Sequence, residues 1–363
     1  MELSGLVPSG ARLIWCQAPF FSPPSPPGKL SCPAVDNRGM RNRRCFLSGR
    51  VYFITSRTEE GLPFVPLRFM NMLLWSALAR AVKLYPVNII ALTIEPNHFH
   101  MMIRVIDPED ASRFVGYFKA ESAHHLNRLL GRQGRTVWSE RFDSPILLDY
   151  EKALDIFSYI LLNPVKDGLV DSIAEYPGVS SYPSLRDGFN HLSVKGIPKS
   201  VVEPLSDPSR PFMEDEKLAQ IYSSDEFRTV TIKLEPESLR KAFRELEAKN
   251  DSEVRELLLS RLEADELTIR QSRGTKRSIG PDCLKRASIL TPHTPPRTGV
   301  RMLCLSTIAE LRKDFIRQFR HLCRQCTEVF NRWKLGFLKT PFPPGMFAPS
   351  LPRRANMIPV VMV

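Results

Sequence analysis

The chain has 363 residues, enough for about two domains, and its 43% hydrophobic and 25% charged residues exclude wholesale disorder. No uninterrupted apolar run of about 18 residues is present, which excludes a membrane-spanning helix and a membrane partner. The 51 Lys and Arg residues outnumber the 39 Asp and Glu residues, so we expect a polyanionic partner such as nucleic acid. Seven cysteines, odd in number and thinly spread, indicate a reducing cytoplasm and not a secreted disulfide scaffold.

The two ends of the chain differ in composition from its middle. Residues 1–39 are rich in Pro and Ser and lack a signal-peptide pattern, so we expect a disordered or spurious extension, with translation starting at Met40. Residues 270–363 hold 18 basic and only 4 acidic residues, a surplus typical of a surface that contacts a phosphate backbone. The sequence therefore predicts a domain over 40–185, a linker over 186–235, a basic helical region over 236–340 and a Pro-rich tail over 341–363.

Hydrophobic periodicity in the predicted domain indicates its fold class. Strands are predicted in the segments VYFITSR, VNIIALTIE, HFHMMIRV and SPILLD. Helical spacing predicts helices that begin near Leu67, Asp110 and Tyr150, the last of them stopped by Pro164. The order strand–helix–strand–strand–helix–strand is the split βαβ, ferredoxin-like pattern. We therefore expect an α+β domain followed by a mostly helical C-terminal extension.

A His-x-His pair in the third predicted strand is the first candidate site. His98 and His100 lie two residues apart, so both side chains emerge on one face, while Phe99 and Met101 lie on the other face under the helices. Two imidazoles on an open sheet face can chelate one divalent cation. The alternative is that one histidine is solvated and the other caps the turn after Pro96.

The third predicted helix carries a second candidate site. Tyr159 and Asn163 are one turn apart on the same face, and Asp155 continues this polar stripe. The phenol is either a nucleophile or half-buried packing, as most helical tyrosines are. The residue before a proline avoids the α region, so we expect Asn163 at the end of the helix.

Four motifs in this half of the chain suggest a family. They are IEPNHFHMMI, VWSERFDSPILLD, YILLNPVKDGLV and YPGVSSY, and they follow one another closely. In this order they resemble the REP-associated tyrosine transposases of the single-tyrosine HUH transposase superfamily, from about Arg43 to Tyr182. The resemblance implies a ferredoxin-like HUH endonuclease domain in which His98, His100 and Asn163 bind Mg²⁺ or Mn²⁺. It also implies that Tyr159 is the catalytic nucleophile.

The resemblance further implies an activity in DNA transposition and recombination. Such a transposase nicks and rejoins single-stranded DNA, in hairpin-forming repeats, through a 5′-phosphotyrosine. The chemistry is consistent, because a divalent ion offsets charge at the attacked phosphate and a covalent intermediate divides the exchange into two steps. We expect a cytoplasmic, nucleoid-associated protein, either a monomer or a homodimer. The alternative is a non-catalytic, domesticated protein that only binds single-stranded nucleic acid.

Several side chains are candidates for supporting roles. His124 and His125 are expected on a solvated helix face, with metal binding or phosphate contact as the alternative. Tyr117 and Tyr150 are alternative nucleophiles, but neither has a polar partner one turn on in the matching motif. Six cations could follow a DNA backbone: Arg57, Lys119, Arg128, Arg132, Arg135 and Arg141.

The basic helix predicted near the C-terminus lies outside the resemblance. Its cations, among them Arg312, Arg317 and Arg324, alternate with aromatic residues such as Phe315 and Phe319. We expect the aromatic side chains to pack inward and the cations to face DNA.

Overall fold

A computed structural model describes residues 44–59, 61, 64–139, 141–292 and 301–349. The expected extension over 1–39, the proposed start at Met40 and the end of the Pro-rich tail lie outside these residues. In the described part of the chain, no helix combines the length and the apolar character needed to cross a bilayer.

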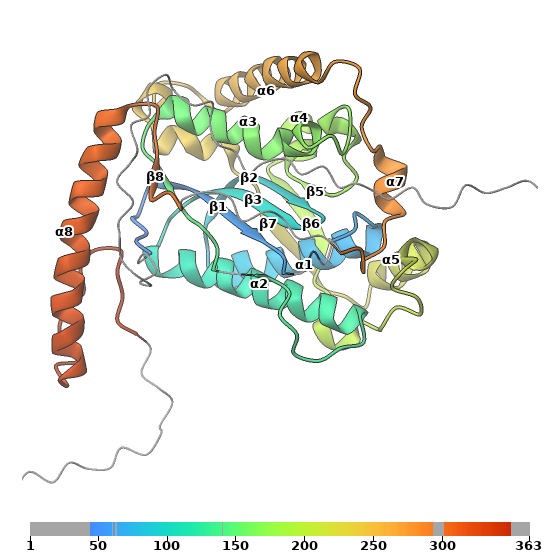
Figure 1. Cartoon of the computed structure of the whole chain (residues 1–363), viewed down its shortest axis with the longest axis horizontal. Helices are drawn as coiled ribbons and strands as arrows, with labels where there is room; N and C mark the ends of the chain where they lie inside the picture. The colour runs from blue at the N-terminus through green and yellow to red at the C-terminus, as the bar shows by residue number, and fades with distance from the viewer. Residues whose placement is uncertain (1–43, 60, 62–63, 140, 293–300, 350–363) are drawn as a thin grey trace, which may run out of the picture.

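A six-stranded sheet with the order β5-β2-β3-β1-β4-β8 lies at the centre of the fold (Figure 1). Its inner strands pair antiparallel, and one helix follows β1 and another follows β3, which is the ferredoxin-like arrangement. The predicted α+β, ferredoxin-like class is therefore confirmed. These strands are β1 (Val51–Arg57), β2 (Asn88–Glu95), β3 (His98–Arg104) and β4 (Ile146–Leu147).

Helices α1 (Arg68–Leu84) and α2 (Pro108–Leu129) cover one face of this sheet (Figure 1). Phe99 and Met101 from β3 are buried against them, and the Phe99 ring meets that of Phe118 edge-on at 5.4 Å between centroids. The predicted orientation of these two strand residues is confirmed.

Helix α3 (Tyr150–Lys166) covers the opposite face, and α6 (Asp251–Arg273) packs on the outer side of α3. Figure 1 shows the resulting layers, with α6, α3, the sheet and the α1–α2 pair following one another. The expectation of an open sheet face around the two histidines is therefore wrong. His100 is only 2% exposed, because the apolar side of α3 packs on β2 and β3.

Pro164 does not stop α3, contrary to the prediction. The helix continues to Lys166, and the backbone N–H of Asp167 still donates to the Asn163 carbonyl at 2.8 Å. Proline cannot donate to the carbonyl four residues earlier and its ring crowds that carbonyl, but here it lies in the last turn, which is buried against the protein. Asn163 therefore lies within the helix and not at its end, with its side chain one turn beyond Tyr159.

The range 186–235, predicted as a linker, contains regular structure. Strands β6 (His191–Lys195) and β7 (Thr229–Lys233) form a two-stranded sheet, and α5 (Asp215–Ser223) packs against α1. The other elements after α3 are η1 (Ile173–Glu175), β5 (Val179–Ser180), α4 (Tyr182–Asp187), η2 (Lys199–Val201), η3 (Pro211–Glu214), η4 (Pro236–Lys241), η5 (Arg244–Leu246), α7 (Pro281–Lys285), β8 (Cys304–Leu305) and α8 (Ala309–Lys334).

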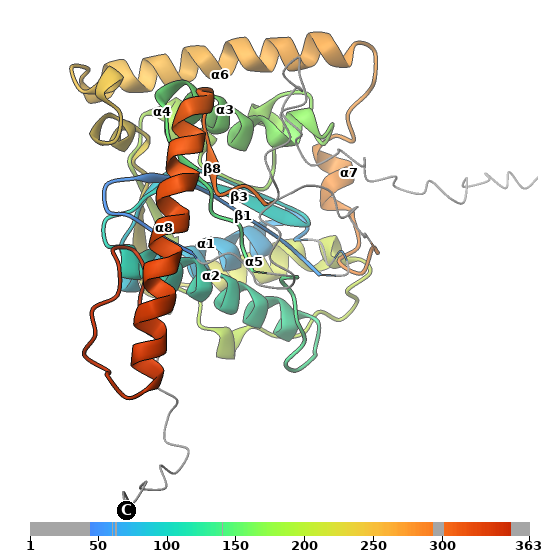
Figure 2. The ribbon, with the colours of Figure 1, turned by 60° about the vertical axis from the view of Figure 1, so that its left-hand side comes forward.

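The C-terminal region contributes to the central sheet as well as to a separate helix. Strand β8 pairs in parallel with β4. Helix α8 then runs along one side of the body and extends beyond it (Figure 2). Phe319 is buried and Phe315 packs on the core, while Arg317 and Arg324 are exposed, so the expected inward aromatic face is present for these residues.

Asp149 connects the start of α3 to the segment after β8. Its Oδ1 caps α3 by accepting from the Lys152 N–H at 2.8 Å, and its two oxygens also accept from the Thr307 hydroxyl at 3.0 Å and the Thr307 N–H at 2.8 Å. Burial alone would raise the pKa of Asp149, but hydrogen bonds from Ser306, Lys152 and Thr307 outweigh burial and lower it.

Replacing Asp149 by alanine should lower the free energy of unfolding by about 2–4 kcal/mol, because a helix cap and two hydrogen bonds to a charged group are lost together. The folded-state pKa is lowered, so this contribution is present at neutral pH and is lost as the pH falls below about 4. Urea unfolding at pH 7 and at about pH 2 measures both effects. The matched control is D107A, which removes the exposed N-cap of α2 and should cost only about 1 kcal/mol. An equal loss in both variants would contradict the connecting role of Asp149.

Candidate active site

The turn between β2 and β3 places both histidines at one end of the sheet. His98 and His100 lie on the same face of β3, with ring centroids 4.6 Å apart. The β2–β3 register sets Glu95 opposite His98. The Asn97 Oδ1 lies 2.7 Å from the His98 Nδ1, so Nδ1 carries the proton and Nε2 presents its lone pair toward α3.

Helix α3 brings the phenol and the carboxamide to these imidazoles. The Tyr159 hydroxyl lies 3.3 Å from the His100 Nε2. One turn later, the Asn163 Nδ2 lies 3.1 Å from the His98 Nε2 and donates to the Glu95 Oε1 at 2.8 Å. The structure therefore brings together all four residues that the resemblance singled out, and it does so through the helical spacing of 159 and 163.

Burial determines the protonation of His100. Burial, followed by the neighbouring charges of His98 and Lys166, lowers the pKa of His100 far below its usual value, so the imidazole is neutral. Its Nδ1 is buried and has no hydrogen-bond partner among the described residues. A neutral imidazole is the form that binds a metal or accepts a proton.

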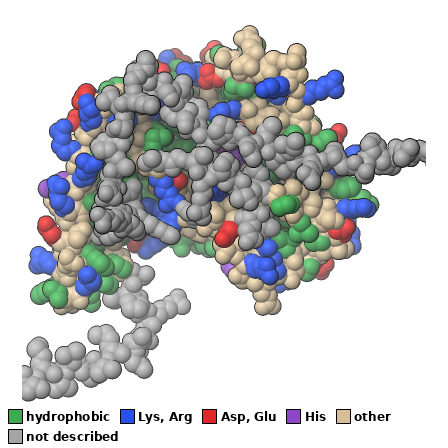
Figure 3. Space-filling view, in the orientation of Figure 1, with side chains coloured by type: hydrophobic (Ala, Val, Ile, Leu, Met, Phe, Trp, Pro, Cys, Tyr) green, Lys and Arg blue, Asp and Glu red, His purple; other side chains and the backbone are tan. Residues whose placement is uncertain are grey.

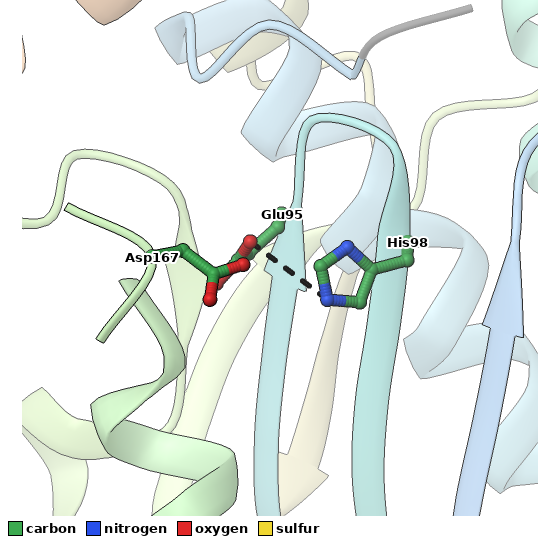
Figure 4. A group of neighbouring side chains, drawn as sticks. All are labelled: Glu95, His98 and Asp167. Atoms are coloured by element: carbon green, nitrogen blue, oxygen red, sulfur yellow. Dashed lines mark ion pairs between the residues drawn. The ribbon is translucent and has the colours of Figure 1, made fainter. Parts of the chain in front are cut away.

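Two carboxylates that the sequence analysis missed complete the cluster. Ligand atoms of Glu95, His98 and Asp167 all lie within 4.8 Å of one another (Figure 4). Burial and then Asp167 raise the pKa of Glu95 well above its usual value. Burial also raises the pKa of Asp167 to about 6, against the lowering effect of Lys166. Two acids held this close repel each other when ionised, and a cation between them would relieve the repulsion.

The sequence did contain a signal for both acids. Asp167 is one turn after Asn163, and Glu95 is the last strand residue before the turn that leads to His98. Because the helix was predicted to end at Pro164, Asp167 was not expected to continue the polar face of Tyr159 and Asn163.

The donor set fits a divalent cation. Imidazole nitrogens of His98 and His100, with carboxylate oxygens of Glu95 and Asp167, are the mixture that Mn²⁺ accepts, and the oxygens suit Mg²⁺. A half-turn of the Asn163 carboxamide would present its Oδ1 in place of Nδ2 at the same position. The His100 Nδ1, which is buried with no hydrogen-bond partner in the described part of the chain, adds an unsatisfied polar atom to the same region.

Aromatic and charged groups both surround Tyr159. Its ring meets Phe53 edge-on at 6.0 Å, and the Lys166 ammonium lies 4.8 Å from the ring centroid. Burial, followed by Asp167 and Glu95, raises the pKa of the phenol, so the hydroxyl is protonated at neutral pH. A group that neutralises negative charge is therefore needed before this oxygen can attack anything.

The six predicted DNA-contacting cations do not form one group. Arg57 lies opposite His98 in the β1–β3 register, and both side chains share the α3 face. The Lys119 ammonium donates to the Ser56 hydroxyl at 2.8 Å, and Arg141 lines a cavity beside β4.

The other three of these cations lie at or after the end of α2. Arg128 donates to the Val202 carbonyl at 2.9 Å and Arg132 to Asn127 at 2.9 Å, so both already hold the fold together. Arg135 is exposed. Three of the six predicted contacts therefore lie near the histidines or the adjacent edge, and two of the rest have structural roles.

The prediction of a solvated face for His125 is wrong, whereas His124 is exposed as expected. His125 is 2% exposed, and its Nε2 lies 3.1 Å from an Arg80 nitrogen. Burial and then Arg80 lower the pKa of His125 to about 3. Of the alternative nucleophiles, Tyr117 lies on α2, across the sheet from the histidines, and Tyr150 forms the first residue of α3, about two turns before Tyr159.

The part of the chain that holds these residues is similar to known proteins. The family model described as "Transposase IS200 like" matches residues 68–161, a span that contains both histidines and Tyr159 and ends just before Asn163. A curated protein of Haemophilus influenzae, whose assigned name proposes a REP-associated tyrosine transposase, is 26% identical over 172 residues, which are 42% of this chain and 97% of the relative. A solved structure of a REP-associated tyrosine transposase bound to a REP hairpin aligns with 41% of this chain and 86% of its own, at 21% identity and a TM-score of 0.36. The resemblance of this chain to the REP-associated tyrosine transposases is confirmed.

Proposed function

We propose that the chain is a metal-dependent endonuclease that nicks and rejoins single-stranded DNA through a 5′-phosphotyrosine at Tyr159. The observation that carries this proposal is the 3.3 Å approach of the Tyr159 hydroxyl to His100, beside the Asn163–His98 contact. A nucleophile next to a cluster of metal-ligand groups is what phosphodiester transfer requires. Hairpin-forming single strands are the substrate class that the resemblance implies.

His98, His100 and Asn163 would hold the cation, with Glu95 and Asp167 close enough to contribute ligands. Mg²⁺ or Mn²⁺ bound there would polarise a non-bridging phosphate oxygen and offset negative charge in the transition state. The protein's own part is to hold the His100 imidazole neutral and to fix the His98 tautomer through Asn97.

Tyr159 carries the bond-forming step in this proposal. Its oxygen attacks phosphorus, the bond from phosphorus to the 3′ oxygen breaks, and the upstream strand leaves with a 3′-hydroxyl. Burial raises the pKa of the phenol, so its proton must be lost during attack, while the 3′ oxygen that leaves phosphorus gains one. The aryl phosphate ester keeps the bond energy, so another 3′-hydroxyl can displace Tyr159 without ATP.

Contacts to the DNA backbone belong to the same proposal. Arg57 shares the face of His98 and would meet phosphates near the attacked bond, and Arg141 lies farther along the edge. Lys119 lies on α2 and contacts Ser56, on the other face of the sheet. Arg128, Arg132 and Arg135 would contact a strand that passes the end of α2.

A covalent protein–DNA adduct tests the chemistry. The full chain is incubated with Mn²⁺ and an oligonucleotide library that has a fixed hairpin and randomised flanks, labelled at either the 3′ or the 5′ end. Only the 3′ label should move with the protein on denaturing gels, because the tyrosine takes the 5′ phosphate. EDTA and Y159F should each abolish the adduct, whereas Y117F and Y150F should keep it within about twofold. Salt-dependent binding with no adduct under any of these conditions would favour the non-catalytic alternative.

Asn97 provides a separate test of the metal site. N97A should weaken Mn²⁺ binding by about 10–100-fold, because the His98 ring loses the group that fixes its tautomer and orientation. N97D keeps an acceptor at that position and should bind within a fewfold of the original protein. Isothermal titration of the full chain with MnCl₂ measures both variants, and an unchanged affinity in N97A would remove His98 from the ligand set.

A further inference from the structure

A second cluster of cations lies at the edge of the sheet where β4 is short. Arg44, Arg141 and Arg301 line one cavity together with Asp143 and Phe142. They come from three separate parts of the chain: the segment before β1, the segment before β4 and the segment before β8. Figure 3 shows Lys and Arg side chains along α8 on this side of the molecule. Folding therefore brings together three guanidinium groups that are far apart in the sequence.

Packing and charge distinguish this cluster from scattered surface arginines. The Arg44 guanidinium lies 3.5 Å from the centroid of the Phe142 ring and donates to the Phe142 carbonyl at 3.3 Å. The Arg301 Nε lies 3.3 Å from an Asp143 oxygen. Burial, followed by Arg141, lowers the pKa of Arg44 to about 10, against the raising effect of Asp143.

Lys119 adds a fourth cation. Burial, followed by Arg44, lowers its pKa to about 8. The groups that these two pKa shifts name are Arg44, Arg141, Arg301, Lys119 and Asp143. Such a concentration of positive charge favours binding of an anion, and a guanidinium fork matches the geometry of a phosphate.

The sheet register relates this cluster to the candidate active site. His100 lies opposite Thr55, and Thr55 in turn bridges to Asp143, so the three residues form a row across neighbouring strands. Strands lie about 4.8 Å apart, so Asp143 is about 10 Å from His100 along this row. Thr55 shares its face with Phe53, whose ring lies 5.3 Å from that of His100. The cavity itself is also lined by Tyr52 and Ile146, whose side chains face α1 and α2. A strand held at Tyr159 would therefore reach the arginines by passing β1 and then the edge of the sheet at β4.

We propose that Arg44, Arg141 and Arg301 bind the phosphodiester backbone of single-stranded DNA next to the phosphate that Tyr159 attacks. The inference rests on the proposed function for its orientation along the DNA. The side chain of Arg301 is 41% exposed and Arg141 is exposed, so the cluster is open to a polymer along its edge. The C-terminal extension thus supplies a DNA contact through Arg301, and α8 borders the same cavity through Phe315 and Phe319.

The salt dependence of DNA binding tests this inference and does not depend on strand cleavage. The probe is a fluorescein-labelled oligodeoxythymidylate of 20 nucleotides. Fluorescence anisotropy measures its dissociation constant from the full chain between 50 and 200 mM NaCl. Each phosphate contact on a single strand contributes about 0.7 to the slope of log K against log salt, so R141A/R301A should lower that slope by about 1.4. Affinity at the lowest salt should fall roughly tenfold.

Matched variants separate charge from folding. R68A removes an exposed arginine at the start of α1 and should leave the slope unchanged. R141K/R301K keeps both charges and should keep the slope, which a general loss of structure would not allow. Thermal unfolding followed by circular dichroism establishes that each variant is folded.

Two results would overturn the inference. One is a slope for R141A/R301A equal to that for R68A, and the other is an equal loss in R141K/R301K. If either occurs while the wild-type chain forms the Tyr159 adduct, the phosphate site fails and the proposed nickase stands. If the slope falls as expected but no adduct forms, the phosphate site stands and the proposed chemistry fails.

Discussion

The crossing of α3 over the histidine end of the sheet is the arrangement on which the candidate active site depends. Neither half of the site is complete without it. The β2–β3 turn alone provides two imidazoles and a carboxylate on a sheet face, and α3 alone provides a phenol and a carboxamide one turn apart. Their contacts at 3.3 Å and 3.1 Å exist because the spacing of Tyr159 and Asn163 along the helix matches that of His100 and His98 along the strand.

The same crossing excludes water, and this has an electrostatic consequence. Covering the face with α3 buries Glu95, His100 and Asn163 to within a few per cent exposure. In that environment an ionised carboxylate is costly, so the pKa values of Glu95 and Asp167 rise while that of His100 falls. Burial therefore favours the uncharged forms of Glu95 and His100. Such a site gains most from a bound divalent cation, which would replace the lost hydration of the acids.

The short-range patterns predicted most of this site. Alternation in β3 placed His98 and His100 on one face, and the four-residue spacing in α3 paired Tyr159 with Asn163. The predictions of the helix end and of the exposed sheet face failed, because tertiary packing determines both. The low helix propensity of proline predicted a helix end at Pro164. In the structure the buried last turn continues to Lys166, and Asp167 therefore lies in the cluster. An open face was expected because no local pattern shows which side of a sheet a later helix will cover.

Strand β8 shows a second limit of sequence patterns, and it also explains how the C-terminal extension joins the site. Two residues, Cys304 and Leu305, are too few for alternation to be read, yet their pairing with β4 fixes the chain on both sides. Upstream, this pairing holds Arg301 beside Asp143. Downstream, it brings Thr307 to Asp149, the residue that begins α3. One carboxylate thus fixes both the helix that carries Tyr159 and the segment that carries Arg301. The same carboxylate therefore ties the positions of Tyr159 and Arg301 to one point in the fold.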